Sequence, residues 1–336
     1  MIARNLMLQH NIEKVVYNYV RLQALVWCSN GLSDPFVTDF KTGEALKSIL
    51  ENNDNKILLI NCCYIQRIDD HSLDSFFESL KENKSSVILF NCEAISRDFS
   101  NYISNFGVKE KSEINEEIVK IGSTPECNLS LEELNTLSTK IEKEYAVTVV
   151  KSTIRENKEI NRRLDSTPLY YNGVYDSSVI LNDYKKFIWI SILMADVART
   201  YRDELLKTTN NIKIISVSLR GSPFASSVAL IIGLNFTSID HLGPKQKLFD
   251  IDFLESPQKW VSYIYVGDFT IGGTEIRIAR AYAQVSQSTL NHGIVIGSLL
   301  SASDYSAFNL KSLLVLNEHF SHIKFGFYKN EIHNDV

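Results

Sequence analysis

The chain has 336 residues, enough for two domains, and its 44% hydrophobic content is that of a globular protein with sizeable cores. A chain that is disordered throughout is therefore excluded. The formal net charge of -5 gives no general attraction to nucleic acids or anionic membranes, so we expect neither as a partner.

We expect neither a targeting segment nor a membrane span. Residues 1–10 lack the continuous apolar core of a signal peptide, and the apolar stretch 187–198 is shorter than the ~20 residues of a membrane-spanning helix. The five cysteines follow no metal-ligand spacing, and we expect them to be reduced thiols. These features predict a cytoplasmic protein.

The first third of the chain predicts a compact α/β unit with its own core. Two apolar runs, at 56–61 and 86–91, are predicted strands. Between them lies a predicted helix, and the residues that form its apolar face are Leu73, Phe76, Phe77 and Leu80. We assign residues 1–115 to this domain.

The segment before this helix reads Ile68-Asp69-Asp70-His71-Ser72-Leu73. It resembles the loop of STAS domains, the anti-anti-sigma factor family, in which Ile-Asp-Ser-Ser-Gly-Leu opens a helix; the similarity covers roughly residues 30–108. The resemblance implies that Asp70 replaces a phosphorylatable serine and keeps a protein-docking loop in one constitutive state. The simpler alternative is that Asp69, Asp70 and Ser72 cap the helix, because negative charge stabilises a helix start.

A charged helical connector is predicted over residues 116–166. Ser130 and Glu133 match a capping box, in which each side chain accepts a hydrogen bond from the other residue's backbone N–H. This pattern predicts a helix from about residue 131 through 145.

Two further elements are predicted before the glycine-rich loops. Asn172-Gly173 stands between aromatic and β-branched residues in the stretch 168–176, the signal of a tight hairpin. A long amphipathic helix is predicted at 183–207, where we expect it to cover a sheet. Its apolar residues, at spacings of three and four, are Phe187, Ile190, Met194, Val197, Tyr201 and Leu205.

Two strand-loop-helix units follow. The strand at 212–218 leads through the loop 219–223 into a helix, and the strand at 263–267 leads through the loop 270–274 into another. A further strand is predicted at 293–297. Strands that alternate with helices imply a parallel sheet, and loops leaving the carboxyl ends of such strands converge on one crevice.

Both loops suit phosphate groups. The loop Thr270-Ile271-Gly272-Gly273-Thr274 can turn several backbone N–H groups toward a phosphate at the positive end of the next helix, and Thr274 can cap that helix. Arg220, beside the amides of Gly221 and Ser222, suits a pyrophosphate. The alternative is an ordinary strand-to-helix turn, which also favours glycine.

Together these segments resemble type I phosphoribosyltransferases, which carry a strand, two acids and a Thr-Thr-Gly-Gly-Thr-like loop for the 5′-phosphate of phosphoribosyl pyrophosphate (PRPP). The similarity covers residues 150–330 and implies a Rossmann-like parallel sheet, with the domain itself at 167–330. It implies that Asp268 binds the ribose hydroxyls and that the loop after Arg220 holds the pyrophosphate with its Mg²⁺, which Asp268 can also contact. The substrate-binding residues that it implies are Arg220, Gly221, Ser222, Phe269, Thr270, Ile271, Gly272, Gly273, Thr274 and Tyr171.

The orotate-type members of this family supply two further expectations. They place a basic hood over the leaving group where this chain has residues 241–247, so Lys245 and Lys247 join Asp268 as catalytic candidates. They also open with a hairpin near the base pocket, where Tyr170, Tyr171 and Tyr175 would stack on a nucleobase. Simple packing of these aromatic rings is the alternative.

The resemblance implies a pentosyltransferase that uses PRPP and Mg²⁺ and a nitrogenous base as acceptor, with a possible homodimer as in many members. Two departures favour a second hypothesis: Gly267 replaces the first of the two acids, and Phe269 alone separates Asp268 from the loop. In that hypothesis the crevice of a non-catalytic sensor binds PRPP or a nucleotide, and the STAS-like unit relays its occupancy to a protein partner.

Overall fold

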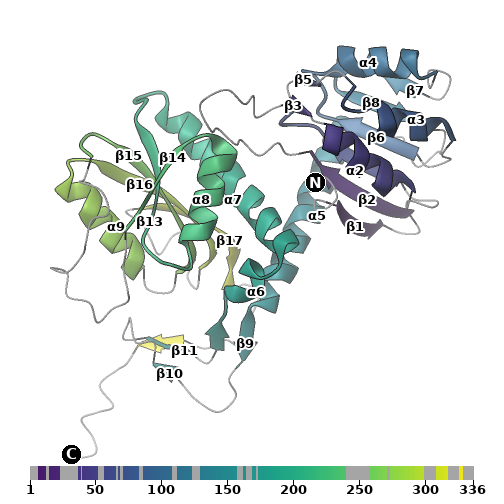
Figure 1. Ribbon diagram of the computed structural model, residues 1–336. Coiled ribbons are helices and arrows are strands. Elements are labelled where there is room, and N and C mark those ends of the chain that lie inside the picture. The colour runs from purple at the N-terminus through teal and green to yellow at the C-terminus, as the bar shows by residue number, and fades with distance from the viewer. Residues whose placement is uncertain are drawn as a thin grey trace, which may run out of the picture. The chain divides into compact units, whose positions relative to one another are not determined.

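The computed structural model describes residues 7–12, 15–22, 37–38, 40–51, 57–65, 67–68, 71–82, 86–107, 112–122, 129–156, 162–163, 169–171, 173–239, 258–270, 273–298, 308–316 and 325–327. The chain divides into two compact units, Met1–Tyr145 and Ala146–Val336, which we call the first and the second unit (Figure 1). No helix among these residues is both long enough and apolar enough to cross a membrane.

The first unit contains a mixed six-stranded sheet with the order β1-β2-β4-β6-β8-β7. The three strands β2, β4 and β6 are parallel, and the remaining pairs are antiparallel. The strands are β1 (Met7–Ile12), β2 (Val15–Arg21), β4 (Ile57–Asn61), β6 (Ser86–Phe90), β7 (Ser112–Ile114) and β8 (Ile118–Ile121), with β3 (Val37–Thr38) and β5 (Arg67–Ile68) as a separate parallel pair. Both strands expected in this region are confirmed, as β4 and β6.

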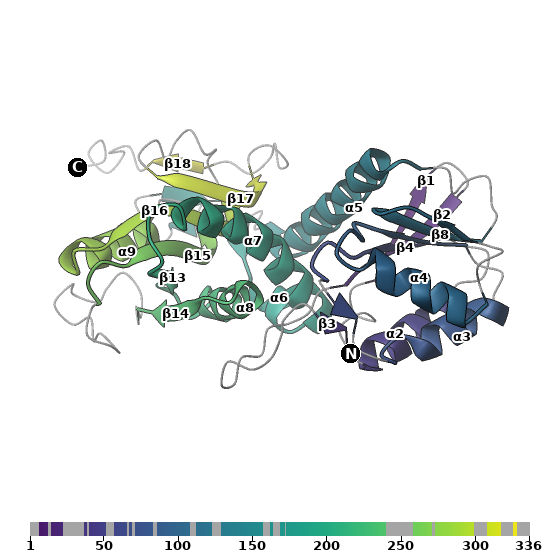
Figure 2. The same cartoon turned by 90° about the horizontal axis from the view of Figure 1, so that it is seen from above.

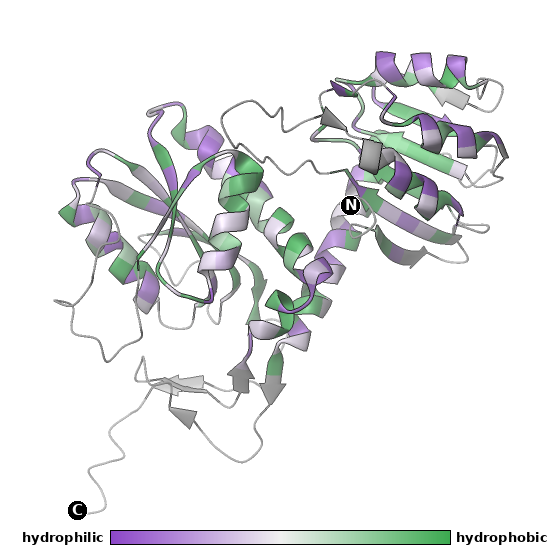
Figure 3. Cartoon of the chain, in the orientation of Figure 1, coloured by the Kyte–Doolittle hydropathy of each residue, from purple (hydrophilic) through white to green (hydrophobic). Residues whose placement is uncertain are grey.

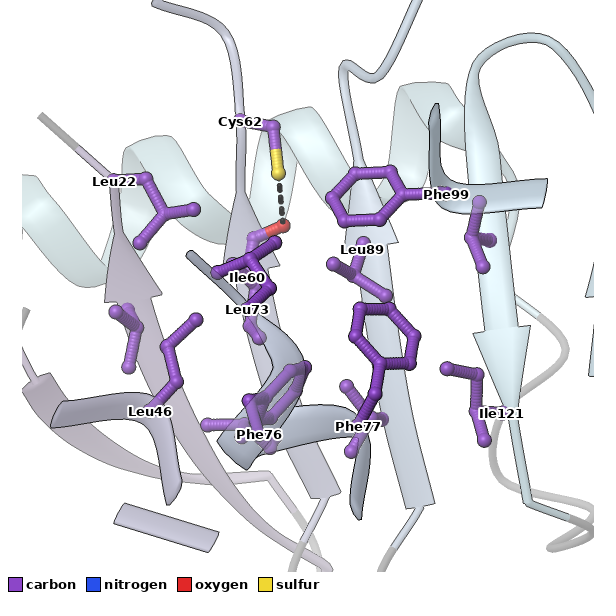
Figure 4. Packing of buried hydrophobic residues seen from close by; sticks show 14 of the residues in the cluster. Leu22, Leu46, Ile60, Cys62, Leu73, Phe76, Phe77, Leu89, Phe99 and Ile121 are labelled. Carbon is purple, nitrogen blue, oxygen red and sulfur yellow. Dashed lines mark hydrogen bonds between the residues drawn. The ribbon is translucent and has the colours of Figure 1, made fainter. Parts of the chain in front are cut away.

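Three helices cover one face of this sheet: α2 (Phe40–Glu51), α3 (Asp74–Glu82) and α4 (Ser96–Asn105). The four residues of the predicted apolar face are all buried, and Phe76 and Phe77 are fully so (Figure 4). Burying one such ring stabilises the fold by roughly 2–3 kcal/mol. Figure 3 shows α3 and α4 with alternating hydrophilic and hydrophobic bands, as expected for helices with one face on a core.

Helix α5 (Leu131–Ser152) begins with the predicted capping box. The backbone N–H of Ser130 donates to Glu133 Oε2 at 2.8 Å, and the backbone N–H of Glu133 donates to Ser130 Oγ at 3.3 Å. The helix continues beyond the expected end at residue 145 to Ser152. The prediction of this helix and its start is confirmed, and the helix extends seven residues beyond its predicted end.

Within the first unit, α5 lies on the sheet face opposite α2, α3 and α4 (Figure 2). The hydroxyl of Tyr19 donates to Glu142 Oε1 at 2.7 Å, and Arg21 forms an ion pair with the same atom at 3.2 Å. Tyr19 and Arg21 alternate with Val20 on β2 and with Leu22 directly after it, and both of these belong to the core under the three other helices. Both faces of the sheet are therefore covered.

The second unit is built on an all-parallel sheet with the order β14-β13-β15-β16-β17, as the alternating pattern predicts. The sheet lies between α9 on one face and α7 with α8 on the other (Figure 1). Its strands are β13 (Ile212–Ser216), β14 (Asn235–Ser238), β15 (Ser262–Thr270), β16 (Thr289–Ser298) and β17 (Asn309–Val315), and its helices are α6 (Ser178–Leu181), α7 (Tyr184–Leu205), α8 (Ser222–Ile232) and α9 (Thr274–Val285).

The long helix α7 matches its predicted range, and the Asp183 side chain caps it by accepting from the backbone N–H of Lys186 at 3.2 Å. Its predicted apolar face is only partly right. Ile190, Met194 and Tyr201 are buried, whereas the other three predicted residues are only partly buried. Buried residues also include Trp189, Ile192 and Ala198, because α7 contacts the sheet, α6 and α8 at once.

The predicted hairpin around Asn172-Gly173 is wrong. The strands on either side are β11 (Leu169–Tyr171) and β12 (Gly173–Tyr175), but they do not pair with each other. β11 pairs with β10 (Arg162–Arg163) and β18 (Phe325–Phe327), and β12 pairs with β9 (Ile154–Glu156). Gly173 itself lies in β12, so a single residue separates the strands, which is too few for a two-residue turn.

Candidate functional site

The predicted phosphate loops leave neighbouring strands of the second sheet. β13 and β15 are parallel and directly paired, with Ile214 opposite Ile264. β13 ends at Ser216 and leads to α8, and β15 ends at Thr270 and leads to α9. Both connections therefore start at the carboxyl edge of one parallel sheet.

The β13 loop contacts β15 closely. A Cβ atom at Gly221 would lie 3.1 Å from the Cα of Gly267, 2.9 Å from Ser218 Oγ and 3.0 Å from Ser216 Oγ. A side chain there would require Ser218 Oγ and the backbone at Gly267 to shift by a few tenths of an ångström, which glycine avoids. This approach brings the loop that carries Arg220, which is exposed, to the end of the strand that carries Asp268.

The amides predicted to bind pyrophosphate already have partners. The backbone N–H of Gly221 donates to Ser218 Oγ at 2.9 Å, and that of Ser222 donates to the carbonyl oxygen of Ser218 at 2.9 Å. The Ser222 hydroxyl also donates to that carbonyl at 2.7 Å. In this conformation the loop offers an anion the charge of Arg220. The N–H groups of Gly221 and Ser222 become available to an anion only if the turn at Ser218 opens.

Asp268 is buried near the end of β15, with 6% of its surface exposed. Burial raises the pKa of its carboxyl, an effect partly offset by the backbone N–H of Phe269 and by the positive charge of Arg220. Arg220 and Asp268 each adjoin one of the two glycines that approach closely, Gly221 and Gly267. The structure therefore brings together two of the predicted site residues from different loops.

The start of α9 differs from expectation by one residue. Gly273 is the N-cap, with φ 68° in the left-handed region that favours glycine, and no side chain caps the helix. Thr274 is already the first helical residue, so its predicted capping role is wrong. Thr270, expected in the loop, is the last residue of β15.

Several predicted residues lie outside the described part of the chain: Ile271, Gly272, Lys245, Lys247 and Asp70. Tyr171 lies in β11, where its backbone pairs with Arg162 and Phe325, and its side chain is not among those described. Its stacking on a nucleobase stays a prediction.

Phe269 packs against the neighbouring strand. A Cβ atom at Gly297 on β16 would lie 2.5 Å from Cε1 and Cζ of Phe269, so the ring occupies the space that a side chain would need. Tyr175 stacks on the same ring at an interplanar angle of 29°. Burial, together with the negative charge of Asp268, raises the pKa of Tyr175. Of the two alternatives for Tyr175, the structure contains the packing arrangement.

Two residues of this region were missed in the sequence. The hydroxyl of Tyr265 donates to Glu275 Oε2 at 3.0 Å. Burial, and secondly the charge of Asp268, raise the pKa of Glu275 to about 7, against hydrogen bonds from Tyr265 and Ser218. An acid in the first turn of a helix has an ordinary explanation in the helix dipole, and Tyr265 has the spacing of a core residue, so neither attracts notice.

A magnesium ion fits this donor set only with help from a ligand. Among the described residues no group of three or more histidine, cysteine, aspartate or glutamate side chains converges on one point. Magnesium is commonly held by one or two carboxylates together with substrate phosphates. Asp268 is suited to that arrangement, with the ion arriving on a pyrophosphate.

Among the comparisons with known proteins, only the comparison with solved structures finds proteins that are similar to this chain. No protein-family model and no curated protein sequence matches the chain. The chain is similar to an orotate phosphoribosyltransferase from Aeropyrum pernix, at 16% identity over 52% of this chain and 97% of that one, with a TM-score of 0.39. It is also similar to an adenine phosphoribosyltransferase from Thermoanaerobacter pseudethanolicus, at 15% identity over 50% and 99%, with a TM-score of 0.37.

Proposed function

We propose that the second unit binds PRPP with Mg²⁺ and transfers the phosphoribosyl group to a nitrogenous base. The observation that carries this proposal is the close approach of Gly221 to Gly267. It joins a loop with an exposed arginine to a strand end with a buried carboxyl, at the carboxyl edge of a parallel sheet. A glycine-capped helix, α9, starts at the same edge.

In this proposal each part of the site binds one part of the ligand. The N–H groups at the start of α9 bind the 5′-phosphate, helped by the helix dipole. Arg220 pairs with the pyrophosphate, and Asp268 accepts hydrogen bonds from the ribose hydroxyls. Bound Mg²⁺ supplies neutralising charge for the pyrophosphate.

The reaction then needs positioning rather than a side-chain nucleophile. A nitrogen of the base forms a bond to C1 of the ribose, the bond from C1 to the pyrophosphate oxygen breaks, and pyrophosphate leaves with the electron pair. The proton on the attacking nitrogen passes to solvent. Fixed geometry and the charge of Arg220 lower the barrier.

A non-catalytic sensor is the second candidate, favoured by the bonded amides of Gly221 and Ser222 and by the absence of an acid at position 267. In that case the first unit relays occupancy to a protein partner through a STAS-like loop at Asp70. A pull-down compares wild type with Asp70→Ser: capture of the same partners by both contradicts that role for Asp70.

The test of transfer is a pyrophosphate-release assay with PRPP, Mg²⁺ and a panel of nucleobases. We expect base-dependent release by the wild type and its loss in an Asp268→Asn, Thr274→Val double variant. Binding of PRPP without release on any base supports the sensor instead. If the protein neither binds PRPP nor releases pyrophosphate, the proposal is contradicted.

A further inference from the structure

Glu275 brings a second carboxyl to the strand ends. It lies in the first turn of α9 and is held from two sides, by the hydroxyl of Tyr265 on β15 at 3.0 Å and by Ser218 in the β13 loop. The negative charge of Asp268 contributes, after burial, to the raised pKa of Glu275. Because Tyr265 and Asp268 are three positions apart on β15, both acids lie near the carboxyl end of this strand, although seven positions separate them in the sequence.

The absence of a side chain at position 267 has a local cause. A Cβ atom at Gly267 would lie 2.5 Å from the hydroxyl oxygen of Tyr265 and 2.8 Å from its Cζ. Tyr265 is itself 1% exposed and packs in the core under α9, so its ring has little room to yield. The place that a side chain at 267 would take is thus filled by the hydroxyl that holds Glu275.

A buried hydroxyl without a partner among the described residues lies at the turn that approaches Gly267. Ser216, the last residue of β13, is fully buried, and its Oγ has no hydrogen-bond partner within the part of the chain that the structure describes. It points toward the Gly221 turn, since a Cβ atom at Gly221 would lie 3.0 Å from that oxygen. Buried hydroxyls are normally bonded, so an unsatisfied one beside the turn that approaches Gly267 points to a polar ligand or water at this turn.

We propose that Glu275 is a ligand-binding residue that acts beside Asp268 on the vicinal hydroxyls of a sugar phosphate. This inference rests on the proposed function and names the part of the ligand that the acids recognise. Two carboxylates offer enough acceptor positions for the two hydroxyl donors of a diol. Tyr265 is the positioning residue, because its hydroxyl fixes Glu275 at the strand end.

The test uses ribose 5-phosphate, 2-deoxyribose 5-phosphate and inorganic phosphate as probes in isothermal titrations. Glu275→Gln keeps an acceptor for the Tyr265 hydroxyl and removes the charge. We expect it to weaken ribose 5-phosphate about tenfold, the effect of losing one charge-assisted hydrogen bond. The preference for ribose over deoxyribose should shrink, while the affinity for inorganic phosphate stays unchanged.

Two further variants serve as a second test and as a control. Tyr265→Phe keeps the packed ring and releases Glu275, so it should reduce the ribose preference in the same direction. Glu204→Gln, at an exposed position near the end of α7, should leave all three affinities unchanged. A purely structural role for Glu275 would change all three probes together and leave the ribose preference intact, which contradicts the inference.

Failure of the inference can be told from failure of the proposed function. If the wild type binds ribose 5-phosphate and the Glu275→Gln protein shows the same affinity and the same ribose preference, the inference alone is overturned. If the wild type binds neither the sugar phosphates nor inorganic phosphate, both the proposed function and the inference are contradicted.

Discussion

The raised pKa of Glu275 makes the stability of the second unit depend on pH. Burial, with the charge of Asp268 second, raises this pKa from 4.5 to about 7. The folded state therefore holds the proton more tightly than the unfolded state does. The resulting stabilisation is fully present below pH 4.5 and is lost as the pH rises through about 7.

The size of the effect follows from the two pKa values. The gap between 4.5 and about 7 corresponds to about 3 kcal/mol of unfolding free energy, at about 1.4 kcal/mol for each pKa unit. Glu275→Gln carries no charge at any pH and keeps an acceptor for Tyr265. Relative to the wild type, the variant should therefore gain up to about 3 kcal/mol between pH 4.5 and pH 8.

The assay is urea unfolding followed by tryptophan fluorescence at a series of pH values. Trp189 is fully buried in α7 and reports on the second unit, and a Trp27→Phe background removes the tryptophan of the first unit. Glu204→Gln, an exposed control, should show no such pH dependence. A stability difference that is the same at every pH, or one that favours the wild type more as the pH rises, would refute the reasoning.

Three other predictions concern packing, capping and thiol reactivity. Gly267→Ala should destabilise the second unit by about 1–3 kcal/mol, because its Cβ would overlap the buried Tyr265 hydroxyl; unchanged urea unfolding contradicts this. Ser130→Ala removes the cap on α5 and should lower the unfolding free energy of the first unit by about 1 kcal/mol, whereas Ser130→Gly should lower it by only a few tenths. Equal losses for the two variants in urea unfolding would argue against the cap. The thiol prediction uses a background in which Cys28 and Cys127 are replaced by serine. A disulfide reagent should modify the exposed Cys63 quickly, and the buried Cys62 and Cys92 only when the protein unfolds. Fast reaction of all three thiols in the folded protein would contradict this burial.

Local signals in the sequence predicted local structure well. The periodicity of Phe76, Phe77 and Leu80 and the pair Ser130 and Glu133 gave α3 and the start of α5, because helix faces and capping boxes depend on residues three or four positions apart. The alternation of strands and helices gave the parallel sheet of the second unit.

Features that depend on distant neighbours were not predictable in this way. Asn172-Gly173 looks like a turn, yet the flanking strands find partners at Glu156 and Phe327, far along the chain. The role of Gly267 depends on the Tyr265 hydroxyl above it. Glu275 has a sufficient local explanation as an acid at a helix start, which conceals its place beside Asp268.

The central claim is tested most directly by calorimetric titration of PRPP with Mg²⁺ into three proteins. Arg220→Gln and Lys259→Gln each remove one exposed positive charge, the first at the carboxyl edge of the sheet and the second just before β15 begins. The account predicts binding by the wild type, affinity at least about tenfold weaker for Arg220→Gln, and unchanged affinity for Lys259→Gln. No binding by the wild type, or equal affinity of the Arg220→Gln protein and the wild type, would contradict it.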